Sequence, residues 1–203
     1  MSEREAILAR VRRAAGHVQE HPGRYRPPEL PCDWERFAAR LRSVGGEAYG
    51  PLAPDALRDT LVRLVGAWAA DRRVVAAAEI AARAGPLPWE TLDPAGPPAA
   101  LSDVEVAILP GSFGVVENAA VALDGRFGRP RAAAFLCQRL VLVLETGALR
   151  PDLHDAFAAL PPDALEHHHC TWISGPSKTA DIEQTLVLGA HGPRALAVIG
   201  VGG

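Results

Sequence analysis

The sequence has few aromatic residues, few cysteines and little net charge, and each shortage excludes a class of protein. Aromatics make up 5% of the 203 residues and hydrophobic residues 48%, so Ala, Val and Leu must fill most of a core. A net charge of −3 offers no basic surface for nucleic acid. Cys32, Cys137 and Cys170 lie far apart and form no CxxC motif, which argues against a disulfide framework and against an iron–sulfur cluster in this chain.

Long hydrophobic runs are also missing. The apolar runs, such as Arg139–Leu144, are far shorter than the roughly 20 residues that a membrane-spanning helix needs. The N-terminal stretch MSEREAILARVRRAAG carries charges where a secretory signal has an apolar segment. We therefore expect a cytoplasmic protein with no membrane span.

The hydrophobic pattern changes along the chain. Residues 1–45 are typical of an N-terminal helical extension, because Ile7 and Val11 recur at helical spacing and Asp33 can cap a second helix. Over residues 46–203, short β-branched runs alternate with helix-like stretches. This pattern predicts one α/β domain with a mostly parallel sheet and flanking helices.

Individual strands can be assigned within this domain. The predicted strands are RVVAAA, VEVAILPG, RLVLVLE, HCTWISG and RALAVIGV. RLVLVLE has the continuous hydrophobicity of a strand that is covered on both faces. We also predict a hairpin in which AAVALDG pairs with PRAAAFL across the glycine-rich turn 125–128, and a helix over residues 151–160.

The stretch ISGPSKTADIEQTLVLGAHGPR, residues 173–194, is a candidate ligand site. It follows the predicted strand HCTWIS, and ligands of open α/β sheets lie beyond the carboxyl ends of strands. Gly175 allows a tight turn. Ser177 and Thr179 offer hydroxyl groups beside the positive charge of Lys178, so this turn could bind a small anion such as a phosphate or carboxylate.

Downstream of this turn the pattern predicts a helix that starts near Asp181, where a capping box can form. The free N–H groups of such a helix start would add to an anion site, and Asp181 would fix the loop. Glu183 is a further candidate site residue; it lies two residues on, so one helix face would not present both carboxylates, and one would cap while the other reaches elsewhere. His191 and Arg194, in a turn before the last strand, could complete the site. The alternative is a loop that only caps a helix, with the lysine in solvent and His191 against helix carbonyls.

A second candidate lies in LPGSFGVVENAAV, residues 109–121. Glu117 follows apolar residues in this stretch, and a carboxylate buried among them would need a partner or a proton. Such a glutamate is a candidate nucleophile or general base. The alternative is a glutamate that accepts hydrogen bonds from backbone amides in a bend between strands.

The run EHHHC, residues 166–170, places metal-capable side chains in a row. On a strand, adjacent residues point to opposite faces, so at most two of them could share one ion. No distant CxxC or HxxxH motif completes a ligand set. We therefore predict no metal site.

The stretch GPSKTADIEQTLVLGAHGPRALAVI resembles the C-terminal signature of the LUD-domain family, and within it the lactate-utilisation protein C group (LutC, also called YkgG). That signature reads close to G-P-S-[RK]-T-A-D-I-E, then G-x-H-G-P, then a final strand. The segment FGVVENAAVAL is also similar to the family, and the likeness covers the chain from about residue 40 onward. The signature is matched at Gly175, Pro176, Ser177, Lys178, Thr179, Ala180, Asp181, Ile182, Glu183, Gly189, His191, Gly192 and Pro193.

The resemblance implies a three-layer α/β sandwich like that of the NagB/RpiA/CoA-transferase group. It also implies a role in oxidising L-lactate to pyruvate beside two iron–sulfur proteins, with the clusters only in those partners and none in this chain. Under this hypothesis the chain binds a small anionic metabolite, which Glu117 and His191 face across a cleft.

Two alternatives remain open. VENA, residues 116–119, is similar to the S-E-N-G segment of CoA transferases, which implies an enzyme of that type, or of the sugar-phosphate-isomerase type, that uses Glu117. Val116 and Ala119 depart from that segment. The other alternative is an assembly factor whose N-terminal helices dock on the iron–sulfur partners.

Overall fold

The computed structural model describes residues 2–14, 23, 31–93, 95–123, 132–160, 170–179 and 186–202. Its helices are α1 (Glu3–Ala14), α2 (Trp34–Ser43), η1 (Pro54–Ala56), α3 (Leu57–Ala69), α4 (Ala78–Ala84), η2 (Pro98–Leu101), α5 (Ala133–Leu136), η5 (Thr146–Ala148) and α6 (Leu153–Ala158). Its strands are β1 (Glu47–Leu52), β2 (Val74–Ala76), β3 (Glu90–Thr91), β4 (Val106–Pro110), β5 (Phe113–Val115), β6 (Ala120–Leu123), β7 (Arg139–Glu145), β8 (Leu149–Arg150), β9 (Thr171–Ile173), β10 (Lys178–Thr179), β11 (Val187–Leu188) and β12 (Ala195–Val201).

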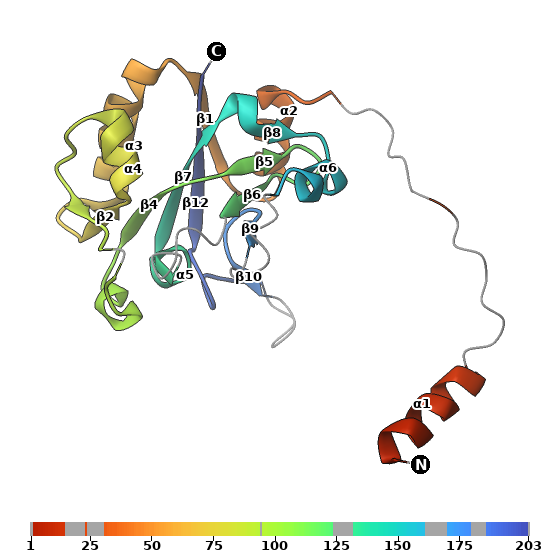
Figure 1. Ribbon diagram of the computed structural model, residues 1–203. Helices are drawn as coiled ribbons and strands as arrows, with labels where there is room; N and C mark the ends of the chain where they lie inside the picture. The colour runs from red at the N-terminus through yellow and green to blue at the C-terminus, as the bar shows by residue number, and fades with distance from the viewer. Residues whose placement is uncertain are drawn as a thin grey trace.

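A parallel sheet forms the centre of the molecule (Figure 1). Its strand order is β1-β12-β7-β4-β2-β3, and every neighbouring pair runs parallel. The middle of β7, from Leu140 to Leu144, is fully buried, because helices and a second layer cover both faces. The predicted α/β class with a mostly parallel sheet is therefore confirmed.

Among the described residues the strands divide among three sheets, which the sequence pattern did not predict; the smallest is the pair β10-β11. β8, β5, β6 and β9 form a separate sheet in which β6 pairs antiparallel with both β5 and β9. The predicted hairpin between AAVALDG and PRAAAFL is wrong in its second half. Residues 133–136 form helix α5, as suits an alanine-rich run. Residues 124–131, which contain the predicted turn, lie outside the described residues.

The molecule has three layers, and the parallel sheet is the middle one. Helices α3 and α4 lie on one side of it, and α2 lies on the other side together with the second sheet (Figure 1). The close contact between α2 and β12 requires glycine at position 200, because a Cβ there would lie 2.7 Å from the ring of Trp34 in α2. The outer face of the second sheet packs on α6 around Phe113 and Ala156.

Helix α2 is part of this core. Asp33 caps it by accepting a hydrogen bond from the N–H of Arg36 at 2.8 Å, as predicted. Trp34, Phe37 and Leu41 are buried against the sheet layers. A boundary at residue 45 would therefore separate α2 from the core that it completes.

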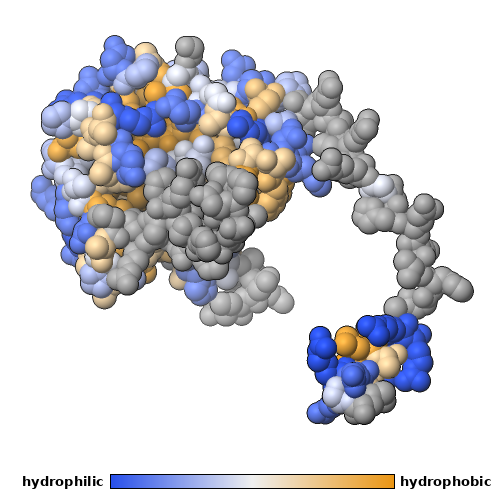
Figure 2. Space-filling model, in the orientation of Figure 1, coloured by the Kyte–Doolittle hydropathy of each residue, from blue (hydrophilic) through white to orange (hydrophobic). Residues whose placement is uncertain are grey.

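Helix α1 contrasts with α2, since none of its residues is buried. Its Ile7 and Val11 are 55% and 58% exposed. Figure 2 shows this apolar surface on α1 among hydrophilic residues. In the part of the chain that the structure describes, no helix is long and apolar enough to cross a membrane.

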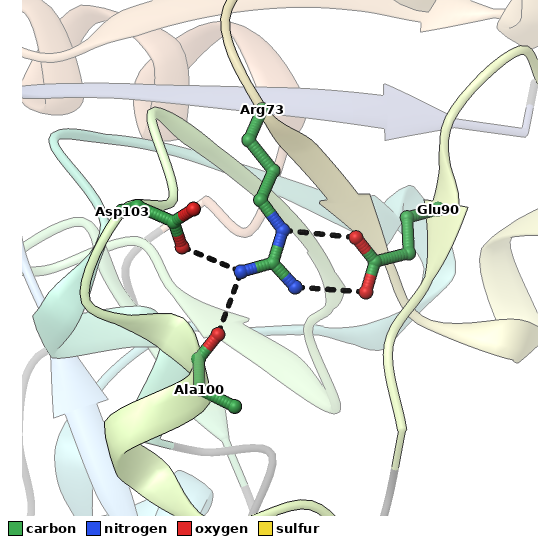
Figure 3. A network of polar contacts seen from close by, with 4 residues as sticks. All are labelled: Arg73, Glu90, Ala100 and Asp103. Atoms are coloured by element: carbon green, nitrogen blue, oxygen red, sulfur yellow. Dashed lines mark hydrogen bonds and ion pairs between the residues drawn. The ribbon is translucent and has the colours of Figure 1, made fainter.

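The edge of the parallel sheet is held by one arginine (Figure 3). Arg73 precedes β2 and donates two hydrogen bonds to the Glu90 carboxylate of β3, at 2.9 and 2.8 Å. It also donates to Asp103 at 2.5 Å and to the Ala100 carbonyl at 2.6 Å. These hydrogen bonds lower the pKa of both carboxylates and raise the pKa of Arg73.

Candidate functional site

The turn that contains Gly175 packs on the C-terminal end of α2. Lys178 donates from its ammonium to the carbonyl oxygen of Val44, the residue that ends this helix, at 2.6 Å. Gly175 has φ +76°, and a Cβ there would lie 2.8 Å from the same carbonyl oxygen. A cation at a helix C-terminus is favourable, because unpaired carbonyls leave partial negative charge there. Lys178 therefore has a structural partner.

Lys178 also lines a cavity of about 600 Å³, which we call the lysine cavity. Ser177 and His191 line it as well, and their loops are joined because the Ser177 N–H donates to the Pro193 carbonyl at 2.8 Å. The walls come from the end of α2, from α5, and from the loops on either side of the β10–β11 hairpin: Ser43, Val44, Ala134, Phe135, residues 172–178 and residues 191–193. The predicted site residues Gly175, Ser177, Lys178 and His191 thus share one cavity.

This cavity lies at the amino-terminal end of the parallel sheet. Val44 precedes β1, Pro193 precedes β12 and Phe135 precedes β7. Figure 1 shows β9, β10 and α5 at the end of the sheet opposite to the chain's C-terminus, where β12 ends. The expectation of a site beyond the carboxyl ends of parallel strands is therefore wrong, because β9 belongs to the second, largely antiparallel sheet.

Thr179 and the residues after it are arranged differently from the prediction. Lys178 and Thr179 form strand β10, which pairs antiparallel with β11 at Leu188 and Val187. The segment before His191 is therefore a strand and a bend, so the alternative in which His191 lies against the carbonyls of a helix end is wrong. Thr179 is not among the described residues that line the cavity. Asp181 and Glu183 lie outside the described residues.

Arg194 does not join the lysine cavity, so we leave it out of the candidate ligand set. Its guanidinium lies 3.2 Å from Glu105, a carboxylate that is 6% exposed and that also contacts Arg139 at 3.3 Å and Arg72 at 3.7 Å. Arg139 begins β7, and Arg194 directly precedes β12. These ion pairs hold the amino-terminal ends of the central strands together.

Glu117 lies in the turn between β5 and β6 and is exposed, so the costly burial that made it a candidate base does not occur. Its carboxylate accepts a hydrogen bond from the N–H of Leu153, the first residue of α6, at 3.3 Å. This is the alternative that the sequence left open, a glutamate bonded to backbone. Ala119 in the same turn has φ +55°, a conformation that favours glycine, which is the residue that S-E-N-G has there.

Glu117 lines a second cavity, of about 410 Å³, which we call the arginine cavity. Its walls are Arg36, Ala39, Arg40, Ser43, Val116 and Glu117. Sequence reasoning missed Arg36 and Arg40; their spacing of four residues on a predicted helix was the signal that could have found them.

The two cavities adjoin each other. Ser43 lines both of them. The turn of Glu117 is also tied to the lysine-cavity loop, because the Ser174 hydroxyl donates to the Asn118 carbonyl at 2.6 Å. The structure thus brings the two predicted motifs together but places Glu117 and Lys178 in neighbouring cavities.

Within the described ranges no group of three His, Cys, Asp or Glu side chains gathers to hold an ion. His167, His168 and His169 lie outside those ranges.

Comparison with solved structures first defines the class of the fold. A crystal structure of a DUF162 family protein from Deinococcus radiodurans matches with a TM-score of 0.61 at 23% sequence identity, over 83% of this chain and 95% of that one. At this identity the likeness establishes the shared α/β fold.

Sequence comparisons then give the family. The model of the LUD domain matches residues 99–201. Lactate utilization protein C of Deinococcus radiodurans is 31% identical over 175 residues, which are 82% of this chain and 78% of that protein. An uncharacterized protein of Neisseria meningitidis serogroup B is 25% identical over 99% of this chain and 94% of its own length. The chain belongs to the LUD domain family, and the resemblance found in its sequence is confirmed.

Proposed function

We propose that this chain is a subunit of a lactate-utilisation system and that it binds a small anion in the lysine cavity. The lactate role is supported by the relatives named lactate utilization protein C, among them one from Bacillus pumilus that is 32% identical over 40% of this chain and 35% of that protein. The system oxidises L-lactate to pyruvate in the cytoplasm, with iron–sulfur clusters on partner proteins.

One observation carries the ligand proposal. The Lys178 ammonium points at the α2 end inside a cavity that also contains the Ser177 hydroxyl and the His191 imidazole. An ammonium has three donors, and the Val44 carbonyl takes one of them. Within the described residues the other two have no acceptor, and they can make charge-assisted hydrogen bonds to a carboxylate or phosphate.

Isothermal titration tests this proposal. L-lactate, pyruvate and glucose 6-phosphate are titrated into the wild type, Lys178→Ala and Arg63→Ala, the last being a control that removes one exposed positive charge from α3. At least one anion should bind the wild type and the control, and Lys178→Ala should weaken it about tenfold or more, which is the loss of one charge-assisted contact. Absence of binding to the wild type, or equal binding to Lys178→Ala, contradicts the ligand proposal.

An assembly role is the second candidate, and the exposed Ile7 and Val11 of α1 favour it. The truncation that tests it must end before Asp33, because α2 belongs to the core. Removal of residues 1–30 should abolish pull-down of the iron–sulfur partners if α1 docks on them. Anion binding should survive this truncation.

A further inference from the structure

Cationic side chains lie in a row along α2. Arg36 and Arg40 are four residues apart, and Val44, which holds the Lys178 ammonium, follows four residues later. Residues at this spacing share one face of a helix, with Cβ atoms about 5–6 Å apart. The two arginine side chains therefore lie on one face of α2, whereas the Lys178 ammonium lies at the C-terminal end of the helix, because it binds the main-chain carbonyl of Val44.

This row crosses both cavities. Arg36 and Arg40 line the arginine cavity, and Lys178 lines the lysine cavity. Ser43 stands between them and is small. Its hydroxyl donates to the Arg40 carbonyl at 2.7 Å, so its side chain lies along the helix. On the α2 side, no large side chain at this position separates the two cavities.

The polar groups along the row differ in how they are engaged. Arg36 contacts Asp33 at 3.8 Å, whereas the Arg40 guanidinium has no hydrogen bond or ion pair within the part of the chain that the structure describes. Glu117 faces these arginines and can accept a hydrogen bond, since a carboxylate has several lone pairs and the Leu153 N–H uses one. The arginine cavity therefore suits a ligand that has both an anionic group and hydroxyl groups.

The volumes of the two cavities also favour a ligand larger than a three-carbon acid. Cavities of about 410 and 600 Å³ fall in the range of roughly 300–1,000 Å³ that holds drug-sized ligands. A three-carbon acid would leave most of that volume to water. A ligand with anionic groups at both ends would reach the arginines and the lysine together.

We propose that the lysine and arginine cavities are two halves of one binding site for a phosphorylated hydroxy acid. One anionic group lies at Lys178 and His191, the other at Arg40 and Arg36, and ligand hydroxyls donate to Glu117. The inference rests on the proposed anion binding at Lys178 and adds the class of ligand.

A matched ligand series tests it. 6-Phosphogluconate carries a phosphate, a carboxylate and hydroxyls, whereas glucose 6-phosphate and gluconate each lack one of the two anionic groups. Calorimetric titration of the full chain should give one 6-phosphogluconate per chain, bound about tenfold or more tightly than either comparator, as expected when a second charged contact is added.

Substitutions in the arginine cavity and in the lysine cavity distinguish one shared site from anion binding at Lys178 alone. Arg40→Ala and Lys178→Ala should each weaken 6-phosphogluconate binding about tenfold, and Arg63→Ala should leave it unchanged. Thermal unfolding of each variant shows whether it is folded. A full loss in Lys178→Ala with no effect of Arg40→Ala would overturn the single site and leave the proposed function standing. Two bound ligands per chain would also overturn it. If none of the three compounds binds, and neither lactate nor pyruvate binds, the single-site proposal and the proposed anion binding at Lys178 are both contradicted.

A second readout observes Lys178 directly by NMR. Lys178 is the only lysine among the chain's 21 basic residues. Biosynthetic incorporation of ¹³Cε-lysine leaves its three N–H donors intact and gives one lysine Cε signal. 6-Phosphogluconate should shift this signal in the wild type, and Arg40→Ala should raise the half-saturating concentration about tenfold. An unchanged half-saturating concentration overturns the single site.

Discussion

The ammonium of Lys178 and the carbonyl oxygen of Val44 lie 2.6 Å apart, so the loop of the LUD signature is fastened to the end of a helix more than a hundred residues earlier in the chain. Lys178 therefore has two roles in this structure, one in holding α2 and one in lining the cavity. The two roles predict separate measurable effects.

Lys178→Met should lower the free energy of unfolding even without ligand. The Val44 carbonyl and the C-terminal end of α2 lose their cation, and we expect a loss of about 0.5–1 kcal/mol because the lysine is exposed. Urea unfolding measures it, with Arg63→Met as the control. Equal midpoints for both variants would show that the hydrogen bond adds nothing to stability.

Gly175→Ala should destabilise the protein by about 1–3 kcal/mol. Its φ of +76° disfavours a side chain, and the added Cβ would meet the Val44 carbonyl oxygen at 2.8 Å. Gly66→Ala is the matched control: Gly66 lies within α3, an added Cβ meets nothing within 4 Å, and alanine favours helix by about 0.5–1 kcal/mol. Opposite shifts in the thermal midpoint are expected, and shifts of the same sign would contradict this account.

Glu105→Gln should lower the free energy of unfolding by about 1–3 kcal/mol, as for the loss of hydrogen bonds to a charged group. The substitution leaves Arg139 and Arg194 without their shared, buried counter-charge. Glu145→Gln, which breaks the exposed pair with Arg83, should stay within about 1 kcal/mol. Guanidinium unfolding of both variants gives the comparison. A loss for Glu105→Gln no larger than for Glu145→Gln would mean that this cluster does not hold the sheet.

Acid should break the ion pairs of Arg73 with Glu90 and Asp103, which we call the Arg73 clamp. Its hydrogen bonds lower the pKa of Glu90 and of Asp103 from ordinary values of 4.5 and 3.8. A lowered pKa in the folded state contributes stability above the ordinary value, and that contribution is lost as pH falls through the folded-state pKa. The stability difference between the wild type and Arg73→Met should thus be constant above about pH 5 and shrink toward pH 3. A difference that does not depend on pH would rule the clamp out.

Cys137 should be unreactive in the folded protein. Burial raises the pKa of its thiol to about 12, so little thiolate exists at pH 8. In a Cys32→Ser/Cys170→Ser variant, labelling of Cys137 by a thiol reagent should therefore occur only upon unfolding. Its rate should rise in step with the unfolded fraction in urea, and rapid labelling without urea would contradict the burial.

The sequence by itself determined the elements whose hydrophobic pattern is unambiguous. RLVLVLE is a strand covered on both faces, Asp33 caps α2, and the signature around Lys178 gives the family. These features are local, because an apolar run, a capping side chain and a motif can be read from neighbouring residues alone.

Only the tertiary structure decided which sheet each strand joins and where the site lies. β9 resembles a strand of the parallel sheet in its composition, yet it pairs with β6 in the second sheet. That pairing moves the Lys178 loop to the amino-terminal end of the parallel sheet, beside the end of α2. The tertiary structure also places Arg194 against Glu105, and Arg36 and Arg40 in the same cavity as Glu117. The physical reason is that strand partners and helix packing are set by long-range burial, which short stretches of sequence do not record.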